Sequence, residues 1–193
     1  MDDFLEYNSW FDEMFRTKLS SRYPTFRVAL NLLYQLPLHR IVETGTIRKA
    51  RDYSAGYSTF VFGHFVKRYG GKITTIDIDS RHMNVCKRVT AEFADWIEYV
   101  VDDSLHALSL LQEPIDLLYL DSLDTPMRHD ATHAQLHNLK EFKLAEPLLH
   151  ERSIVLIDDN SFANGGKSRM TKHYLHEKGW RLLLNLRQSV WIR

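Results

Sequence analysis

IVETGT (41–46), IRKARDYSA (47–55), GYSTFVFGHFVKRYGG (56–71) and KITTIDID (72–79) form the stretch that decides the fold. A short apolar run ends at Glu43 and Gly45, and a polar loop then returns to Gly56. About three turns of helix follow, and a second apolar run ends at Asp77 and Asp79. This order is typical of a βαβ unit that holds a nucleoside. The stretch therefore predicts a ligand site before any catalytic residue is considered.

Length and composition limit the class of protein. The chain has 193 residues, of which 44% are hydrophobic, which suits one compact domain over residues 1–193. Lys plus Arg and Asp plus Glu both number 25, so no overall field attracts nucleic acid or an anionic membrane. The single cysteine, Cys86, excludes a disulfide framework within the chain. We expect a cytoplasmic protein, because the acidic N-terminus is unlike a signal peptide and no apolar run is long enough to span a membrane.

Hydrophobic periodicity predicts the fold class. Residues 1–24 carry apolar side chains at helical spacing, so they predict an N-terminal helical cap that Pro24 would end. From residue 25 onward, helical patterns alternate with apolar runs, and the runs cover 39–44, 72–78, 96–102, 115–121 and 153–159. Two further runs, 181–186 and 189–193, are separated by a short polar connection. The pattern predicts a doubly wound, mostly parallel seven-stranded sheet in a three-layer α/β/α arrangement, with an antiparallel C-terminal hairpin.

The glycines and acids of the opening stretch indicate which ligand it holds. Gly45 and Gly56 would let the backbone pass close to a ligand, and Asp77 at the end of a strand could accept both hydroxyls of a ribose. The alternative is that the glycines only make turns and that Asp77 caps a helix. Glu43 is poorly suited to lie beside a pyrophosphate, so a cationic ligand is favoured over a dinucleotide.

The order of strand-ETG, loop, helix and strand-D, followed by VVDDS (100–104) and LLYLD (117–121), resembles the Rossmann-like S-adenosylmethionine-dependent methyltransferases. The resemblance covers residues 25–193. It implies that Glu43 and Gly45 border the methionine part of the cofactor, while Asp77 binds the ribose. The insert 47–55 departs from the usual compact loop. The cofactor-binding residues that the resemblance implies are Glu43, Thr44, Gly45, Thr46, Gly56, Tyr57, Ser58, Asp77, Asp103, Ser104 and Asp121.

Acids also end two further predicted strands, at Asp121 and at Asp158, Asp159 and Asn160. The carboxyl ends of neighbouring parallel strands meet at one edge of a sheet, so these oxygens could share a hard cation such as Mg²⁺. This arrangement resembles the metal-dependent O-methyltransferases of the catechol and macrocin types. Asp121, Asp159 and Asn160 match the catechol type, and Asp158 could replace Asp159 as a ligand. Alternatively, Asp121 contacts the cofactor and residues 158–160 form a polar turn.

The chemistry that the resemblance implies requires a base. A divalent ion lowers the pKa of an acceptor hydroxyl, and a nearby group then removes its proton. Catechol-type enzymes carry a lysine three residues beyond the metal aspartate, whereas this chain has Asp124, which leaves Asp124, His129 and His133 as candidate catalytic residues. The helically spaced histidines lack a HExxH zinc motif, and NGGKS (164–168) lacks the first glycine of a phosphate-binding loop.

The favoured function is therefore S-adenosylmethionine-dependent and Mg²⁺-dependent O-methylation of a small molecule, a sugar or a secondary metabolite. The alternatives are a non-catalytic S-adenosylmethionine-binding accessory protein and another metal-dependent reaction, such as hydroxylation. A nucleic-acid methyltransferase is disfavoured because DSLD (121–124) stands where such enzymes carry a DPPY-like set. We expect a hydroxylated small molecule as partner, no nucleic acid and no membrane, with a homo-oligomer as an open possibility.

Overall fold

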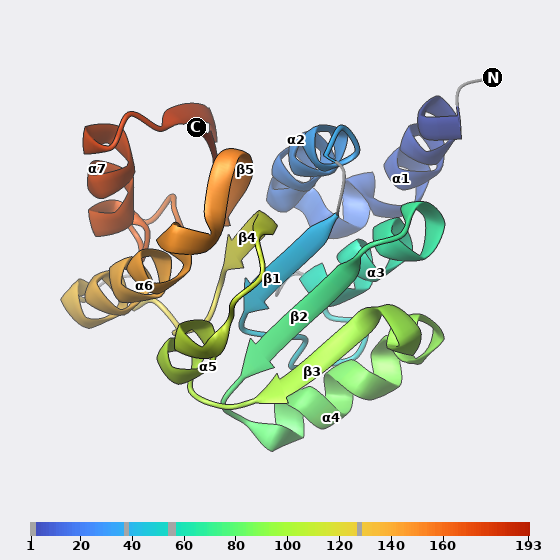
Figure 1. Cartoon of the computed structure of the whole chain (residues 1–193), viewed down its shortest axis with the longest axis horizontal. Coiled ribbons are helices and arrows are strands. Elements are labelled where there is room, and N and C mark those ends of the chain that lie inside the picture. The colour runs from blue at the N-terminus through green and yellow to red at the C-terminus, as the bar shows by residue number, and fades with distance from the viewer. Residues whose placement is uncertain (1–2, 37–38, 54–56, 127–128) are drawn as a thin grey trace.

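The computed structural model describes residues 3–36, 39–53, 57–126 and 129–193, and its centre is a seven-stranded sheet (Figure 1). The strand order is β3-β2-β1-β4-β5-β7-β6. Neighbours from β3 to β5 are parallel, whereas β7 is antiparallel to both β5 and β6. The strands are β1 (Arg40–Thr44), β2 (Lys72–Asp77), β3 (Ile97–Val101), β4 (Ile115–Leu120), β5 (Leu149–Ile157), β6 (Arg181–Asn185) and β7 (Ser189–Ile192). The predicted sheet and its C-terminal hairpin are confirmed.

Helices cover the sheet on two faces (Figure 1). The α-helices are α1 (Asp3–Leu19), α2 (Tyr23–Leu33), α3 (Ser58–Tyr69), α4 (Ser80–Val89), α5 (Ser104–Leu110), α6 (Thr132–Ala145) and α7 (Arg169–Glu177). Short 3-10 turns occupy Ser20–Arg22, Ala91–Trp96 and Glu146–Leu148. The described helices include none that is long and apolar enough to cross a bilayer.

Each face of the sheet has its own core because neighbouring strand residues point to opposite sides. Ile41 and Leu117 face the layer formed by α1, α2 and α3, where buried aromatic side chains fill most of the space. Val42 and Leu118 face the opposite layer, which contains α5, α6 and α7. The strands read as continuous apolar runs for this reason. Acidic side chains lie at the carboxyl ends of β2, β4 and β5, at Asp77, Asp121 and Asp158.

The N-terminal segment differs from its prediction in one respect. Pro24 does not end a helix but lies in the first turn of α2, where its missing N–H has no helical partner to lose. The preceding helix α1 ends at Leu19, and a 3-10 turn joins the two. The apolar side chains of α1 pack on the sheet core, with Phe11 and Phe15 completely buried.

Candidate active site

A cavity of about 320 Å³ lies where β1, β2 and β4 end and their loops begin. Carboxyl ends of strands are the usual ligand position in a doubly wound sheet. The cavity is lined by Gly45, Arg48, Ile76, Asp77, Ile78, Asp79, His82, Asp103, Ser104, Ser122, Leu123, Asp124 and His137. Four of the residues predicted to bind cofactor, Gly45, Asp77, Asp103 and Ser104, therefore meet in one crevice, together with the predicted base Asp124.

Gly45 sets the shape of the crevice between β1 and β4. Its φ is 83°, in the left-handed region that favours glycine. A Cβ at this position would lie 2.4 Å from the carbonyl oxygen of Asp121. The backbone of β1 therefore passes closer to the end of β4 than any side chain would permit, and the following residue, Thr46, turns toward β2.

Asp77 is fixed at the end of β2 by backbone donors. Its Oδ2 accepts from the N–H of Thr46 at 3.2 Å, and its Oδ1 accepts from the N–H of Asp79 at 2.8 Å. The cap of α4 is Asp79, whose Oδ1 accepts from the N–H of Arg81 at 2.8 Å. Asp77 is therefore not the helix cap that the alternative interpretation required, and its carboxylate lines the cavity.

The far end of the crevice combines a helix start with a histidine from another helix. Asp103 caps α5, accepting from the N–H groups of Leu105 and His106. The Oγ of Ser104 lies 3.1 Å from Nε2 of His137 in α6. The buried Glu141 is 3.4 Å from the same nitrogen, and this carboxylate raises the pKa of His137. This end offers both donors and acceptors to a ligand.

Glu43 lies beneath the crevice rather than in its wall. Its side chain is completely buried, and its Oε1 accepts from the hydroxyl of Thr59 in α3. Burial is the main cause that raises the pKa of this carboxyl to about 7. Thr44 is also completely buried at the end of β1. Both residues support the loop 45–46 from below.

The helix α3 begins at the other predicted cofactor residues. Tyr57 has a φ of 49°, and its hydroxyl accepts from the N–H of Arg51 at 3.2 Å. Ser58 starts α3 and is buried. Neither residue lines the cavity. Gly56 lies outside the described residues.

The acids after β4 and β5 are paired with cations of the chain. Nζ of Lys167 lies 2.7 Å from Oδ1 of Asp121 and 3.6 Å from Oδ2 of Asp159. Arg187 forms a second ion pair with Asp159. The hydroxyl oxygen of Tyr119 lies 3.1 Å from Oδ2 of Asp121. These carboxylates are therefore occupied by protein donors.

Asp158 is the most deeply enclosed of these acids. It is completely buried, and its Oδ2 accepts from Nε of Arg22 at 2.6 Å and from the hydroxyl of Tyr119 at 2.8 Å. Burial opposes ionisation of Asp158, but Arg22 and Lys167 outweigh it and hold its pKa below the ordinary value. Asp158 faces the core beside α2 and not the crevice.

The predicted magnesium ligands do not fit a divalent ion. Asn160 turns its Oδ1 to the hydroxyl of Ser168 and donates its Nδ2 to Asn185, while Lys167 stands between Asp121 and Asp159. Among the residues that the structure describes, no group of three or more His, Cys, Asp or Glu side chains could hold a metal ion. The ends of β4 and β5 do lie side by side as predicted. The acids there form ion pairs with Arg22, Lys167 and Arg187, which come from other segments of the chain.

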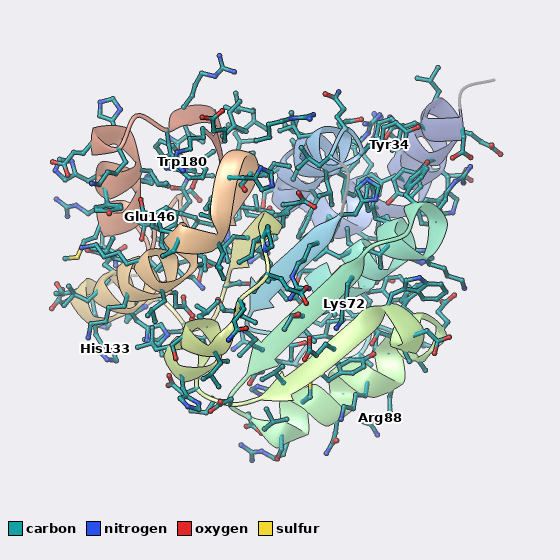
Figure 2. All side chains as sticks on the ribbon, in the orientation of Figure 1. Tyr34, Lys72, Arg88, His133, Glu146 and Trp180 are labelled. Atoms are coloured by element: carbon teal, nitrogen blue, oxygen red, sulfur yellow. The ribbon has the colours of Figure 1, made fainter. Side chains whose placement is uncertain are left out.

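Of the three predicted catalytic residues, only Asp124 lines the cavity that the structure describes. Asp124 lines the cavity, but Nη1 of Arg48 donates to both of its oxygens at 3.0 and 2.9 Å. This hydrogen bond is the main reason that the pKa of Asp124 is below its ordinary value, which is unfavourable for a base. His129 and His133 are exposed and do not line the cavity, and His133 lies at the periphery of the molecule (Figure 2).

The sequence prediction missed Lys167, Arg48 and the role of His137 in the crevice. Lys167 lies in NGGKS (164–168), where two glycines before a lysine could have indicated a loop that returns to the site. Arg48 lies in the insert 47–55, and the sequence pattern assigns no role to this particular residue. His137 is one of three helically spaced histidines, with His129 and His133. Nothing in the sequence distinguishes it from these two exposed residues.

Comparison with known families decides the class of protein. A family model described as a methyltransferase domain matches residues 53–160. The chain belongs to this methyltransferase family. The resemblance to the Rossmann-like S-adenosylmethionine-dependent methyltransferases is thereby confirmed. No curated protein matches the sequence.

Solved methyltransferases share the fold of this methyltransferase at low sequence identity. The cofactor-bound Rv0187 from MTB is 18% identical, with a TM-score of 0.65 over 88% of this chain and 79% of that chain. The TDP-rhamnose 3'-O-methyltransferase of calicheamicin biosynthesis is 15% identical, with a TM-score of 0.65 over 88% and 77%. An O-methyltransferase from Bacillus cereus in complex with SAH is 13% identical, with a TM-score of 0.56 over 97% of each chain.

Proposed function

We propose that this methyltransferase binds S-adenosylmethionine in the crevice and transfers its methyl group to a hydroxyl oxygen of a small molecule. The observation that carries the proposal is the crevice itself, in which Gly45 and Asp77 meet at the ends of β1 and β2. Asp77 would accept the ribose hydroxyls, and Ser104 with His137 would contact the adenine end. The negative charge of the crevice acids suits a sulfonium cofactor.

Two of the similar structures support oxygen as the acceptor. One is a TDP-rhamnose 3'-O-methyltransferase and another is an O-methyltransferase. In the reaction proposed here, the acceptor oxygen forms a bond with the methyl carbon as the bond from carbon to sulfur breaks. The electron pair of that bond remains on sulfur as a thioether, and the acceptor hydroxyl gives up its proton. We expect the acceptor to be a sugar or another hydroxylated metabolite.

The site can assist this reaction chiefly by positioning the two reactants. The crevice is closed on one side by the ion pair between Arg48 and Asp124, which come from the loops after β1 and β4. Asp124 would be a weak base while this pair is closed, because the hydrogen bonds from Arg48 hold the pKa of its carboxyl below the ordinary value. Magnesium is not part of the proposal, since Lys167 and two arginines already satisfy the acids predicted to bind it.

Isothermal titration calorimetry of the pure chain with S-adenosylmethionine and with S-adenosylhomocysteine tests the proposed cofactor. We expect both to bind, and the absence of binding by either would reject the proposal. A library of nucleotide sugars and hydroxylated aromatics, screened for S-adenosylhomocysteine release, then tests the acceptor. Cofactor binding without turnover on any acceptor would instead favour the accessory S-adenosylmethionine-binding protein.

A further inference from the structure

The acids that follow β4 and β5 already enclose a cation of the chain itself. Lys167 is 2% exposed, and its Nζ lies 2.7 Å from Oδ1 of Asp121. The same nitrogen is 3.6 Å from Oδ2 of Asp159. Burial lowers the pKa of a lysine, but Asp121, Asp159 and Asp158 together hold the pKa of Lys167 above its ordinary value. A permanent positive charge therefore lies between the ends of two adjacent strands.

The loop between β5 and α7 is shaped to place this side chain. Gly166 has a φ of 63°, and a Cβ there would lie 1.7 Å from the carbonyl oxygen of Asp159, so the loop packs directly against the end of β5. On the other side of Lys167, the hydroxyl of Ser168 donates to Oδ1 of Asn160 at 2.8 Å. The residues on both sides of Lys167 thus contact the end of β5, and these contacts restrict movement of the Lys167 ammonium away from the acids.

The other acids of the cluster are paired with basic side chains as well. Arg22 pairs with Asp158 through a 2.6 Å contact, and Arg187 pairs with Asp159. Three carboxylates therefore meet three cations, counting Lys167 on Asp121. A divalent ion would have to displace Lys167 and would leave the cluster with excess positive charge. Charge balance and ligand occupancy both oppose metal binding.

We propose that Lys167 is the resident cation of this site and takes the place of the divalent ion in metal-dependent O-methyltransferases. The chain then binds no divalent metal at Asp121 and Asp159. The catalytic meaning of this inference rests on the proposed function: methyl transfer would proceed without a metal. Lys167 would act as a positioning residue that holds the Asp121 carboxylate, which is 21% exposed, at the edge of the crevice.

Mn²⁺ binding, followed by electron paramagnetic resonance and calorimetry, tests this inference without a substrate or cofactor. We expect no binding at this site by the parent chain. Lys167→Ala frees Asp121 and leaves Asp159 with Arg187 as its cation, and we expect the variant to gain affinity for Mn²⁺ of at least about tenfold over the parent. Lys178→Ala removes an exposed lysine at the end of α7 and should leave Mn²⁺ affinity unchanged. Lys167→Ala combined with Asp121→Asn should lose the gained affinity.

Two results would overturn the inference. One is Mn²⁺ binding by the parent chain that Asp121→Asn abolishes, because it would mean that a metal displaces Lys167. The other is a folded Lys167 variant that gains no Mn²⁺ affinity. If Lys167→Ala does not fold, Lys167→Gln keeps most of the side-chain volume and serves as the second variant. Calorimetry with S-adenosylmethionine on the same preparations separates these results from a failure of the proposed function.

Discussion

Asp77 and Asp158 show two outcomes for an acid at the end of a buried parallel strand. Asp77, the last residue of β2, accepts from two backbone N–H groups and lies 3.4 Å from Nδ1 of His82, and it lines the cavity, where a ligand can reach it. Asp158, after β5, receives Arg22 and Tyr119 and is completely buried. The two positions are equivalent in the sheet. The difference lies in whether another segment of the chain supplies a cation.

This comparison divides the carboxyl edge of the sheet into two halves. The open half, around β1, β2 and β3 and including residues 122–124 after β4, has the cavity and the acids available to a ligand. The closed half, around β4 and β5, has acids neutralised by Arg22, Lys167 and Arg187. An acid that lines the cavity should contribute to ligand binding, whereas a buried acid or ion pair should contribute to stability. Four substitutions test that division, from the largest expected effect to the smallest.

Removal of Arg22 should have the largest effect. Arg22→Ala leaves Asp158 buried without its main counter-charge, and we expect a loss of about 3–5 kcal/mol in the free energy of unfolding. Arg16→Ala removes an exposed partner of Asp12 and serves as the control, with an expected change of at most about 1 kcal/mol. Urea unfolding followed by circular dichroism measures both. Equal losses for the two variants would contradict the buried role of the Arg22 pair.

Glu43 should make stability depend on pH. Its folded pKa is about 7, against an ordinary value of 4.5, so the folded chain keeps a proton that the unfolded chain loses across this range. Stability should therefore fall as pH rises from 4.5 to 7, by roughly 3 kcal/mol in total. Glu43→Gln has no titrating group at this position, so its free energy of unfolding should lack the part of the pH dependence that Glu43 causes. Unfolding at a series of pH values, with exposed Glu151→Gln as control, measures the difference, and parallel curves for parent and Glu43→Gln would reject the assignment.

Asp77 should affect cofactor affinity more than fold stability. Asp77→Ala removes the carboxylate proposed to accept the ribose hydroxyls, and a charge-assisted hydrogen bond of this kind corresponds to about tenfold to a hundredfold in affinity. Calorimetry with S-adenosylhomocysteine measures the change. Asp124→Ala, in the same cavity, is the matched control and should change affinity much less. If both variants bind like the parent, the cofactor does not occupy this cavity as proposed.

The ion pair across the crevice should have the smallest effect on stability. Arg48 and Asp124 have side-chain exposures of 46% and 74%, so water screens their attraction. Arg48→Ala should change the free energy of unfolding by less than about 1 kcal/mol. Urea unfolding of the parent and of Arg48→Ala measures this. A loss as large as that of Arg22→Ala would show that the division between open and closed halves is wrong.

Much of the architecture could be predicted because it depends on local patterns. The apolar runs that became β1 to β5 are bounded by polar residues, and the final hairpin has two runs with a short connection. Gly45 and Asp77 were recognised from their place at strand ends, which is a property of the nearby sequence. The prediction for Pro24 is wrong, because a proline that stops one helix can equally start the next, and Pro24 lies in the first turn of α2.

The partners of the acids could not be predicted, because they come from distant parts of the chain. Arg22 is 136 residues from Asp158, and Lys167 is 46 residues from Asp121. No periodicity links such pairs. The magnesium prediction rested on the acids alone and therefore omitted the cations that the fold brings to them.

The sequence by itself determined the order of strands and helices and the positions of the strand-end acids, since both follow from hydrophobic periodicity and from the polarity of strand ends. Only the tertiary structure decided which of these acids face a cavity and which are neutralised. The physical reason is that a carboxylate's role depends on the charges and the solvent around it, and folding sets both. For Asp77 folding provides a cavity, and for Asp121 it provides Lys167.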